Sequence, residues 1–207
     1  MAELFASLAP TPLAERLRPG TIHDVLGQDH LLGAEGPLGR MLANRKLASL
    51  ILWGPPGCGK TTIARLLAES VDLHFEPLSA VFSGVADLSK VFEAARQRRK
   101  DGRGTLLFVD EIHRFNRAQQ DGFLPVVEDG TIVLVGATTE NPYFQVNAAL
   151  LSRCQLYTLE PLTEIDVAEI LRRGAALVGV EAEAELLAHI AAQAGGDARS
   201  ALGILEL

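Results

Sequence analysis

The segment Gly54-Pro55-Pro56-Gly57-Cys58-Gly59-Lys60-Thr61 decides the fold of this 207-residue chain. It matches G-x-x-x-x-G-K-[ST], the P-loop pattern, in which glycines let backbone N–H groups wrap a phosphate. The N-terminus of the helix that follows adds the positive end of its dipole. We therefore expect this segment and Thr62 to bind a nucleotide, with Lys60 at the β- and γ-phosphates and Thr61 as a ligand of Mg²⁺.

The flanks of this segment have the pattern that a P-loop requires. Residues 47–53 form an apolar run that is too short for a helix, which predicts a buried strand. Residues 60–70 then place Ile63, Leu66 and Leu67 at helical spacing. The motif thus lies between a strand and a helix, as in nucleotide-binding folds.

Strand and helix patterns alternate along the next hundred residues. Strands are predicted at 73–78, 105–109, 131–135 and 155–159, and helices at 85–100 and 119–127. Such alternation predicts right-handed crossovers and a parallel sheet covered on both faces, the α/β class of P-loop NTPases. The leader over residues 1–45 is broken by prolines and glycines, and we expect it to be irregular.

The character of the chain changes after Pro161. Residues 163–178 and 182–194 are rich in Ala, Leu and Glu at helical spacing, and a third helix begins at Ala198. We expect residues 1–160 to form the nucleotide-binding subdomain and residues 161–207 a small helical lid. The third helix shows no stop signal, so we also expect the lid to be truncated and the native protein to continue.

Two carboxylates follow the apolar stretch at 105–109. Asp110 and Glu111 come directly after this predicted strand, at the end where open α/β sheets bind ligands. Two adjacent acids can divide the work, one in the Mg²⁺ shell and one at the water beyond the γ-phosphate. We assign Asp110 to the metal and Glu111 to the role of general base.

Composition excludes several classes of protein. The chain is 48% hydrophobic with a net charge of −7, which rules out disorder and disfavours global attraction to nucleic acid or an anionic membrane. Its two cysteines form no metal or disulfide pattern, and no signal or membrane segment is evident. We expect a cytoplasmic protein without a membrane partner.

Four motifs in this order resemble the AAA+ ATPases of the clamp-loader group. They are the P-loop, Asp110-Glu111-Ile112-His113, Gly136-Ala137-Thr138-Thr139 and Leu151-Ser152-Arg153-Cys154, and a helical region follows. More narrowly, residues 51–57, 113–121 and 136–142 resemble the branch of this group that serves replication-associated recombination. The resemblance covers nearly the whole chain.

The resemblance implies four further site residues. Thr139 occupies the sensor 1 position, with Asn141 as the alternative; a Thr pair after a strand is otherwise typical of a turn cap. Arg153 corresponds to the arginine that enters the neighbouring subunit's site, and Arg199 to the sensor 2 arginine of the lid. Val25, with Leu26, resembles the wall of the adenine pocket.

The resemblance also implies an activity. It predicts a Mg²⁺-dependent, DNA-dependent ATPase acting at stalled forks, gaps or single-strand/duplex junctions in recombination and repair. Implied partners are DNA, further copies of the chain as a homo-oligomer, and single-strand DNA-binding protein, with a nucleoid-associated location. The alternatives are a clamp-loader subunit, a branch-migration motor, a module that holds nucleotide without turnover, and a P-loop kinase, which has no use for Arg153 or the lid.

A basic cluster spans residues 96–103, with five basic residues and one acid. It is either a contact for the DNA backbone or a solvated helix end whose charges complement the helix dipole. No aromatic residues are interleaved to stack on bases, which favours the solvated helix end.

Overall fold

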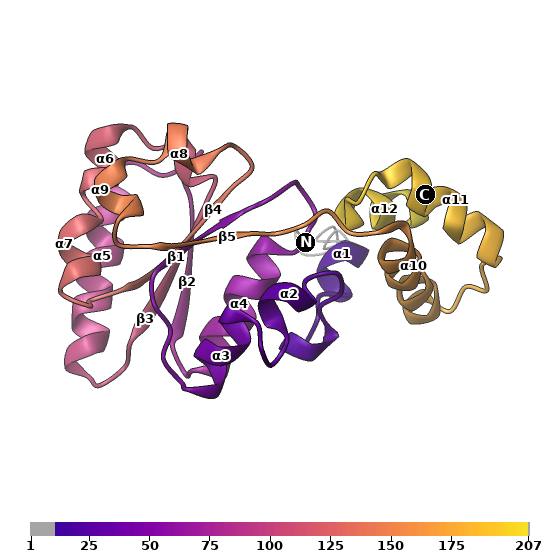
Figure 1. Cartoon of the computed structure of the whole chain (residues 1–207), viewed down its shortest axis with the longest axis horizontal. Coiled ribbons are helices and arrows are strands. Elements are labelled where there is room, and N and C mark those ends of the chain that lie inside the picture. Colours follow the sequence, from indigo (N-terminus) through magenta and orange to yellow (C-terminus); the bar gives the residue numbers. More distant parts are fainter. Residues whose placement is uncertain (1–10, 207) are drawn as a thin grey trace, which may run out of the picture. The chain divides into compact units, whose positions relative to one another are not determined.

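The computed structural model describes residues 11–206, which fold into two compact units. The α/β unit comprises residues 19–161, and the helical unit comprises residues 11–18 together with 162–206. Figure 1 labels the elements of both. No helix in this part of the chain combines the length and apolar character needed to cross a membrane.

Five strands form one sheet in the α/β unit. Their order is β2-β3-β4-β1-β5, and every neighbouring pair is parallel. The bounds are β1 Leu50–Trp53, β2 His74–Ser79, β3 Thr105–Asp110, β4 Val133–Thr138 and β5 Gln155–Thr158. The predicted α/β fold with a parallel sheet flanked by helices is confirmed.

Helices cover both faces of the sheet (Figure 1). One face carries α2 Asp29–Leu32, α3 Pro37–Ala43 and α4 Lys60–Ser70; the other carries α5 Val85–Lys100, α6 Arg117–Asp121, α7 Leu124–Glu128 and α9 Ala148–Leu151. Leu50 and Leu52 of β1 pack into the first core, and Ile51 packs into the second. Burying one such side chain contributes about 1.5–3 kcal/mol, so alternation along β1 fixes its register.

The helical stretch predicted near residues 119–127 is divided in the structure. The structure has two short helices, α6 and α7, with Gly122 and Phe123 between them. Pro125 lies in the first turn of α7, where its missing N–H is tolerated, whereas it would break the interior of a longer helix. Phe123 is fully buried, which holds the break in place.

The leader is more regular than predicted. Residues 11–45 contain α1 Leu13–Arg16, the 3₁₀ helix η1 Ile22–Asp24, and the helices α2 and α3. Pro37 begins α3 instead of interrupting it, because the first helical position needs no N–H donor. The strand predicted over 131–135 also differs, since β4 begins at Val133 and continues to Thr138. Residues 1–10 of the leader lie outside the described residues.

The helical unit packs α1 against α10 Glu164–Val178, α11 Ala184–Ala194 and α12 Ala198–Leu205. Leu13 is fully buried in its core beside Leu171 and Leu202. The Leu13 N–H also donates to Glu206 Oε1 at 2.6 Å. Residues 11–18 therefore belong to this unit, whereas the boundary expected at residue 160 placed them with the sheet.

Candidate functional site

Three loops meet at one edge of the sheet. Because β4 lies between β3 and β1 and all three run parallel, their carboxyl ends face the same way. The P-loop leaves β1, Asp110 and Glu111 leave β3, and Thr139 leaves β4. The sheet order thus brings together residues that are far apart in the sequence, at the edge where α/β sheets bind ligands.

The P-loop has the backbone geometry that wraps an anion. Gly57 and Gly59 have φ angles of 69° and 101°, which a side chain would strain. Gly54 lies so close to β5 that an added Cβ would be 2.7 Å from the Leu159 carbonyl oxygen. Gly59 caps the N-terminus of α4, so the unpaired N–H groups of that helix begin at the loop.

Lys60 is held over the loop. Its Nζ donates to the carbonyl oxygens of Gly54 at 2.8 Å and Pro55 at 2.7 Å. Only 9% of the residue is exposed, so its ammonium group is largely removed from water. A buried cation of this kind is stabilised by hydrogen bonds and by nearby negative charge, which suits a phosphate ligand.

Neither cysteine has the setting of a reactive thiol. Cys58 is 1% exposed and packs in the core below the P-loop. The loop therefore presents backbone groups at its surface and not an accessible thiol. Burial raises the pKa of the Cys154 thiol to about 12, which keeps it protonated beside Arg153. We therefore expect thiol reagents to spare the folded site.

Glu111 stands in a strained backbone conformation. Its φ is 54° and its ψ 45°, in the left-handed region that residues other than glycine rarely adopt. Such strain costs on the order of 1–3 kcal/mol and is concentrated at functional sites. Asp110 is the last residue of β3, so this turn begins directly after the strand.

The structure separates the two candidates for sensor 1 by their contacts. Thr139 Oγ1 lies 3.5 Å from Glu111 Oε2. The Asn141 side chain instead accepts from the Tyr143 N–H at 3.0 Å, as the N-cap of the short helix α8 Pro142–Gln145. Thr139 is therefore the candidate that reaches the proposed base.

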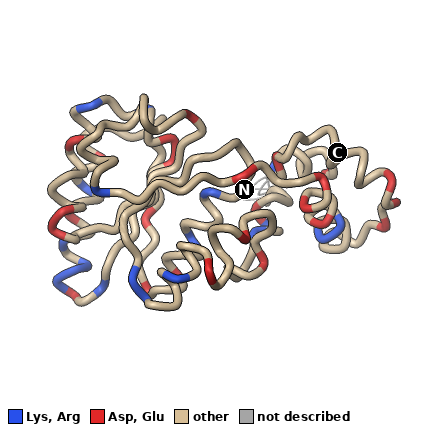
Figure 2. Tube along the Cα trace, viewed as in Figure 1, with Lys and Arg blue, Asp and Glu red and all other residues tan. Residues whose placement is uncertain are grey.

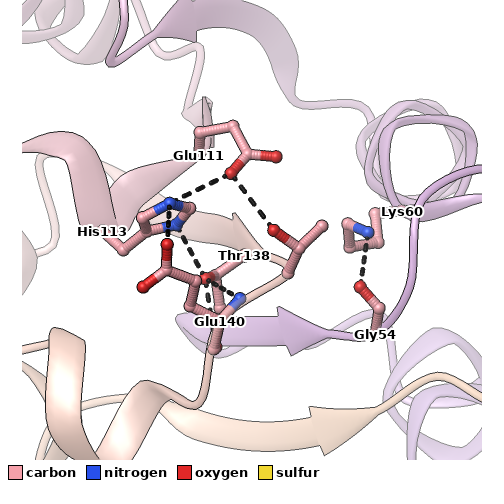
Figure 3. Close-up of polar contacts among 7 residues, drawn as sticks. Gly54, Lys60, Glu111, His113, Thr138 and Glu140 are labelled. Carbon is pink, nitrogen blue, oxygen red and sulfur yellow. Dashed lines mark hydrogen bonds and ion pairs between the residues drawn. The ribbon is translucent and has the colours of Figure 1, made fainter.

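Sequence reasoning assigned no role to His113, which lies in the 3₁₀ helix η2 Ile112–Arg114. Its side chain is 4% exposed, and Nε2 lies 3.3 Å from both Glu111 Oε2 and Glu140 Oε1. Nδ1 lies 2.9 Å from Thr138 Oγ1. Figure 3 shows these groups around one buried ring. Its position two residues after the predicted base is a sequence signal for the contact with Glu111, but not for the burial of the ring.

The remaining predicted residues lie at other places. Arg153 pairs with Glu128 at 2.5 Å and donates to the Ala149 carbonyl oxygen at 2.7 Å, on an exposed surface. Arg199 is exposed at the start of α12 in the helical unit. Val25 is partly buried in the core that also contains Cys58 and Ile63 of the P-loop region.

The oxygen groups near the P-loop fit Mg²⁺. Thr61 and Asp110 are both partly exposed. Among the described residues no group of three or more His, Cys, Asp or Glu side chains converges to cage a metal ion. Magnesium usually takes one or two carboxylates together with substrate phosphates and water, so a hydroxyl and one carboxylate suffice.

The basic cluster at the end of α5 is largely paired with acids. Figure 2 shows Lys and Arg gathered at this end of the helix, beside acidic positions. Arg98 lies 2.6 Å from Glu76, and Arg99 lies 3.6 Å from Asp129. Hydrogen bonds from Thr131 hold the pKa of Asp129 below its ordinary value, so this carboxylate stays charged. These pairs favour the solvated helix end over a DNA contact.

Comparison with known proteins gives consistent relatives. The sequence model of the ATPase family associated with various cellular activities (AAA) matches residues 50–162. Replication-associated recombination protein A of Coxiella burnetii is 50% identical over 95% of this chain and 46% of its own length. The Escherichia coli K12 protein of that name is 48% identical over 95% and 45%. The chain thus spans about half the length of these relatives.

A solved structure has the same fold. The Thermotoga maritima RuvB Holliday junction branch migration motor matches with a TM-score of 0.77 and 29% sequence identity. The match covers 92% of this chain and 64% of that one.

Proposed function

Because the chain belongs to the AAA family of ATPases, we propose that its sheet edge binds ATP with Mg²⁺ and hydrolyses the terminal phosphate. One observation carries the proposal. The P-loop, Glu111 and Thr139 leave neighbouring parallel strands at the same edge, and Thr139 lies 3.5 Å from Glu111. This arrangement supplies a phosphate cradle and a base in one place.

The P-loop residues bind the nucleotide in this proposal. The backbone N–H groups from Gly57 to Thr62 surround the phosphates, and Lys60 exchanges its carbonyl partners for the β- and γ-phosphate oxygens. Thr61 and Asp110 hold Mg²⁺, which neutralises charge on the phosphates when it is bound. Val25 and Leu26 form the apolar wall for adenine.

Glu111 is the proposed general base. Its carboxylate accepts a proton from the water that attacks the γ-phosphorus, while the bond from that phosphorus to the bridging oxygen of ADP breaks. Thr139 helps to orient the carboxylate and the water. The Glu111 side chain is 29% exposed, which leaves room for a water beside it.

Two arginines act from outside this edge in the proposal. Arg153 serves the site of a neighbouring copy, where its charge stabilises the transition state; it must then leave Glu128. Arg199 reports the nucleotide state to the helical unit. A single copy of this chain is therefore expected to bind ATP but to hydrolyse it slowly.

We place the activity in replication-associated recombination, at forks, gaps or single-strand/duplex junctions. The names of the relatives support this placement. They include replication-associated recombination protein A and the RuvB Holliday junction branch migration motor. The net charge of −7 adds no support, so any DNA contact must be local. The proposed setting is the cytoplasm at the nucleoid, with a homo-oligomer as the active form and single-strand DNA-binding protein as a further partner.

The test is steady-state ATP hydrolysis by the protein, with and without forked or gapped DNA, beside Arg153→Ala. The proposal predicts that DNA raises turnover and that Arg153→Ala lowers kcat at least about tenfold. In related reactions an arginine acting in trans raises kcat by a factor of about 10³–10⁵. Arg96→Ala, at the end of α5, is the matched control. ATP binding without turnover under every condition would contradict the proposal and favour a nucleotide-holding module.

A further inference from the structure

His113 is a largely enclosed polar side chain at the proposed site. Its imidazole is 4% exposed and lies among two carboxylates and one hydroxyl. The aliphatic residue before it, Ile112, is fully buried and anchors η2 in the core. Both ring nitrogens therefore face polar groups of this cluster.

The surrounding groups determine where the ring hydrogen lies. Thr138 Oγ1 accepts from the Glu140 N–H at 3.0 Å and has one hydrogen of its own to donate. That hydrogen goes either to the Glu140 carbonyl oxygen, at 3.2 Å, or to His113 Nδ1, at 2.9 Å.

The two arrangements differ in the hydrogen on Nε2. If Thr138 donates to Nδ1, the neutral ring has its hydrogen on Nε2. If Thr138 donates elsewhere, Nδ1 donates to Thr138, and an Nε2 lone pair would then face two carboxylates. The first arrangement avoids that repulsion and is therefore the favoured one. The Nε2 hydrogen then faces the two carboxylates, 3.3 Å from Glu111 Oε2 and 3.3 Å from Glu140 Oε1.

The contacts of Glu111 divide its two oxygens. Both His113 Nε2 and Thr139 Oγ1 contact the same atom, Oε2. In Figure 3 the other oxygen points to the side on which Lys60 lies. One oxygen of the carboxylate is thus anchored, and the other is left for the water that the proposed reaction requires.

We infer that His113 is a positioning residue for Glu111, and that it donates its Nε2 hydrogen to Oε2 so that Oε1 is presented to the attacking water. The inference rests on the proposed ATPase function and deepens it. Thr138 contacts the other nitrogen of the ring. A chain of contacts thus runs from Thr138 of β4 through His113 to Glu111 and fixes the direction of the base. Glu140 lies against the same nitrogen and links this anchor to the loop before α8.

Two conservative substitutions separate positioning from packing. A glutamine at position 113 carries its amide nitrogen about where Nε2 lies, so His113→Gln keeps a donor for Glu111. An asparagine carries its amide group about where Nδ1 lies, so His113→Asn keeps a polar partner for Thr138 and loses the donor for Glu111. His113→Ala loses both contacts.

The kinetic test compares kcat and the Kd for ATP. A misplacement of about 1 Å can reduce a rate on the order of 100-fold, so we expect His113→Ala and His113→Asn to lower kcat at least about tenfold. His113→Gln should retain most of kcat, and the Kd for ATP should stay within about twofold in all three. His74→Gln is the matched control. His74 also contacts a glutamate, Glu76 at 3.2 Å, but it is the first residue of β2 and lies at the end of that strand away from the proposed site. Equal loss in the Gln and Asn variants would overturn the inference.

A second measurement does not depend on turnover. Two-bond ¹H–¹⁵N spectra report which ring nitrogen of each histidine carries a hydrogen, and His113→Gln identifies the signal. We expect a protonated Nε2 whose shift moves in Glu111→Gln and stays in place in Glu76→Gln. An unprotonated Nε2, or one insensitive to Glu111, would overturn the inference even if the protein hydrolyses ATP. If the spectrum is as expected but the protein shows no turnover, only the proposed ATPase function is contradicted.

Discussion

The two units of the molecule use charged residues in opposite ways. At the sheet edge of the α/β unit, Lys60 and His113 are buried and hydrogen-bonded, and Glu111 has a strained backbone. In the helical unit the charges lie on the surface, as in the pairs that Glu169 makes with Arg172 and Arg173. Both units have apolar cores, and among the described residues the one Lys, Arg, Asp or Glu that is buried as a whole, Lys60, lies in the first unit.

This difference indicates where chemistry and stability are located. Buried polar groups are expensive unless they are fully paired, so their presence at one edge marks a site that is built to act on a ligand. The helical unit relies instead on packing and on caps, such as the Thr163 side chain that accepts from the Asp166 N–H at 3.1 Å. Substitutions should therefore affect turnover in one unit and stability in the other.

The largest expected effect is that of Glu111→Gln on turnover. A positioned general base contributes about 10²–10⁴ in rate, and the amide cannot accept the proton, so we expect kcat to fall by that range. Glu140→Gln changes the other carboxylate near His113 and should have a far smaller effect. A fall in kcat of less than about tenfold in Glu111→Gln would remove the contrast between the two units.

Leu171→Ala should have the largest effect in the helical unit. Leu171 is fully buried in the core of that unit, and such truncations cost about 2–5 kcal/mol in the free energy of unfolding. Ile165→Ala, on the same helix, is the control, because Ile165 is 82% exposed and should change stability by less than about 0.5 kcal/mol. Urea unfolding followed by circular dichroism measures both; similar values for the two variants would contradict the assigned packing.

The smallest expected effect is that of Glu169→Gln. Hydrogen bonds from Arg172 and Arg173 lower the pKa of Glu169 from 4.5 to about 2. Because the pKa is lower in the folded state, the stabilisation is complete above pH 4.5 and is lost as the pH falls toward 2. A surface pair contributes less than about 1 kcal/mol, so the variant should lose that much at pH 7 and progressively less below pH 4.5. A difference independent of pH would show that the ion pairs contribute nothing.

Much of this account was predictable from local sequence patterns. Spacing along the chain reveals the P-loop, the acids at the end of β3 and the alternation of strands and helices. These patterns predicted the fold and the edge of the sheet at which the site lies. The contact between Glu111 and Thr139 depends on β4 lying beside β3. The family resemblance gave Thr139 its role at the site, but spacing along the chain could not give this strand order.

The parts that sequence reasoning missed depend on packing between distant segments. His113 and Thr138 meet because two strands are neighbours, and a lone histidine carries no signal of its burial. Leu13 joins the helical unit through its contacts with α10 and α12, from the other end of the chain. The break between α6 and α7 was within reach, because Pro125 already argued against a continuous helix.

The most direct test of the central claim is ATP binding by calorimetry, because the claim places a nucleotide at the P-loop edge. The wild-type protein should bind MgATP at one saturable site. Lys60→Ala should bind about 10- to 100-fold more weakly, as expected for the loss of a charged hydrogen bond, and Lys100→Ala should bind as the wild type does. Equal affinity in the wild type and Lys60→Ala, or no binding by the wild type, would contradict the account.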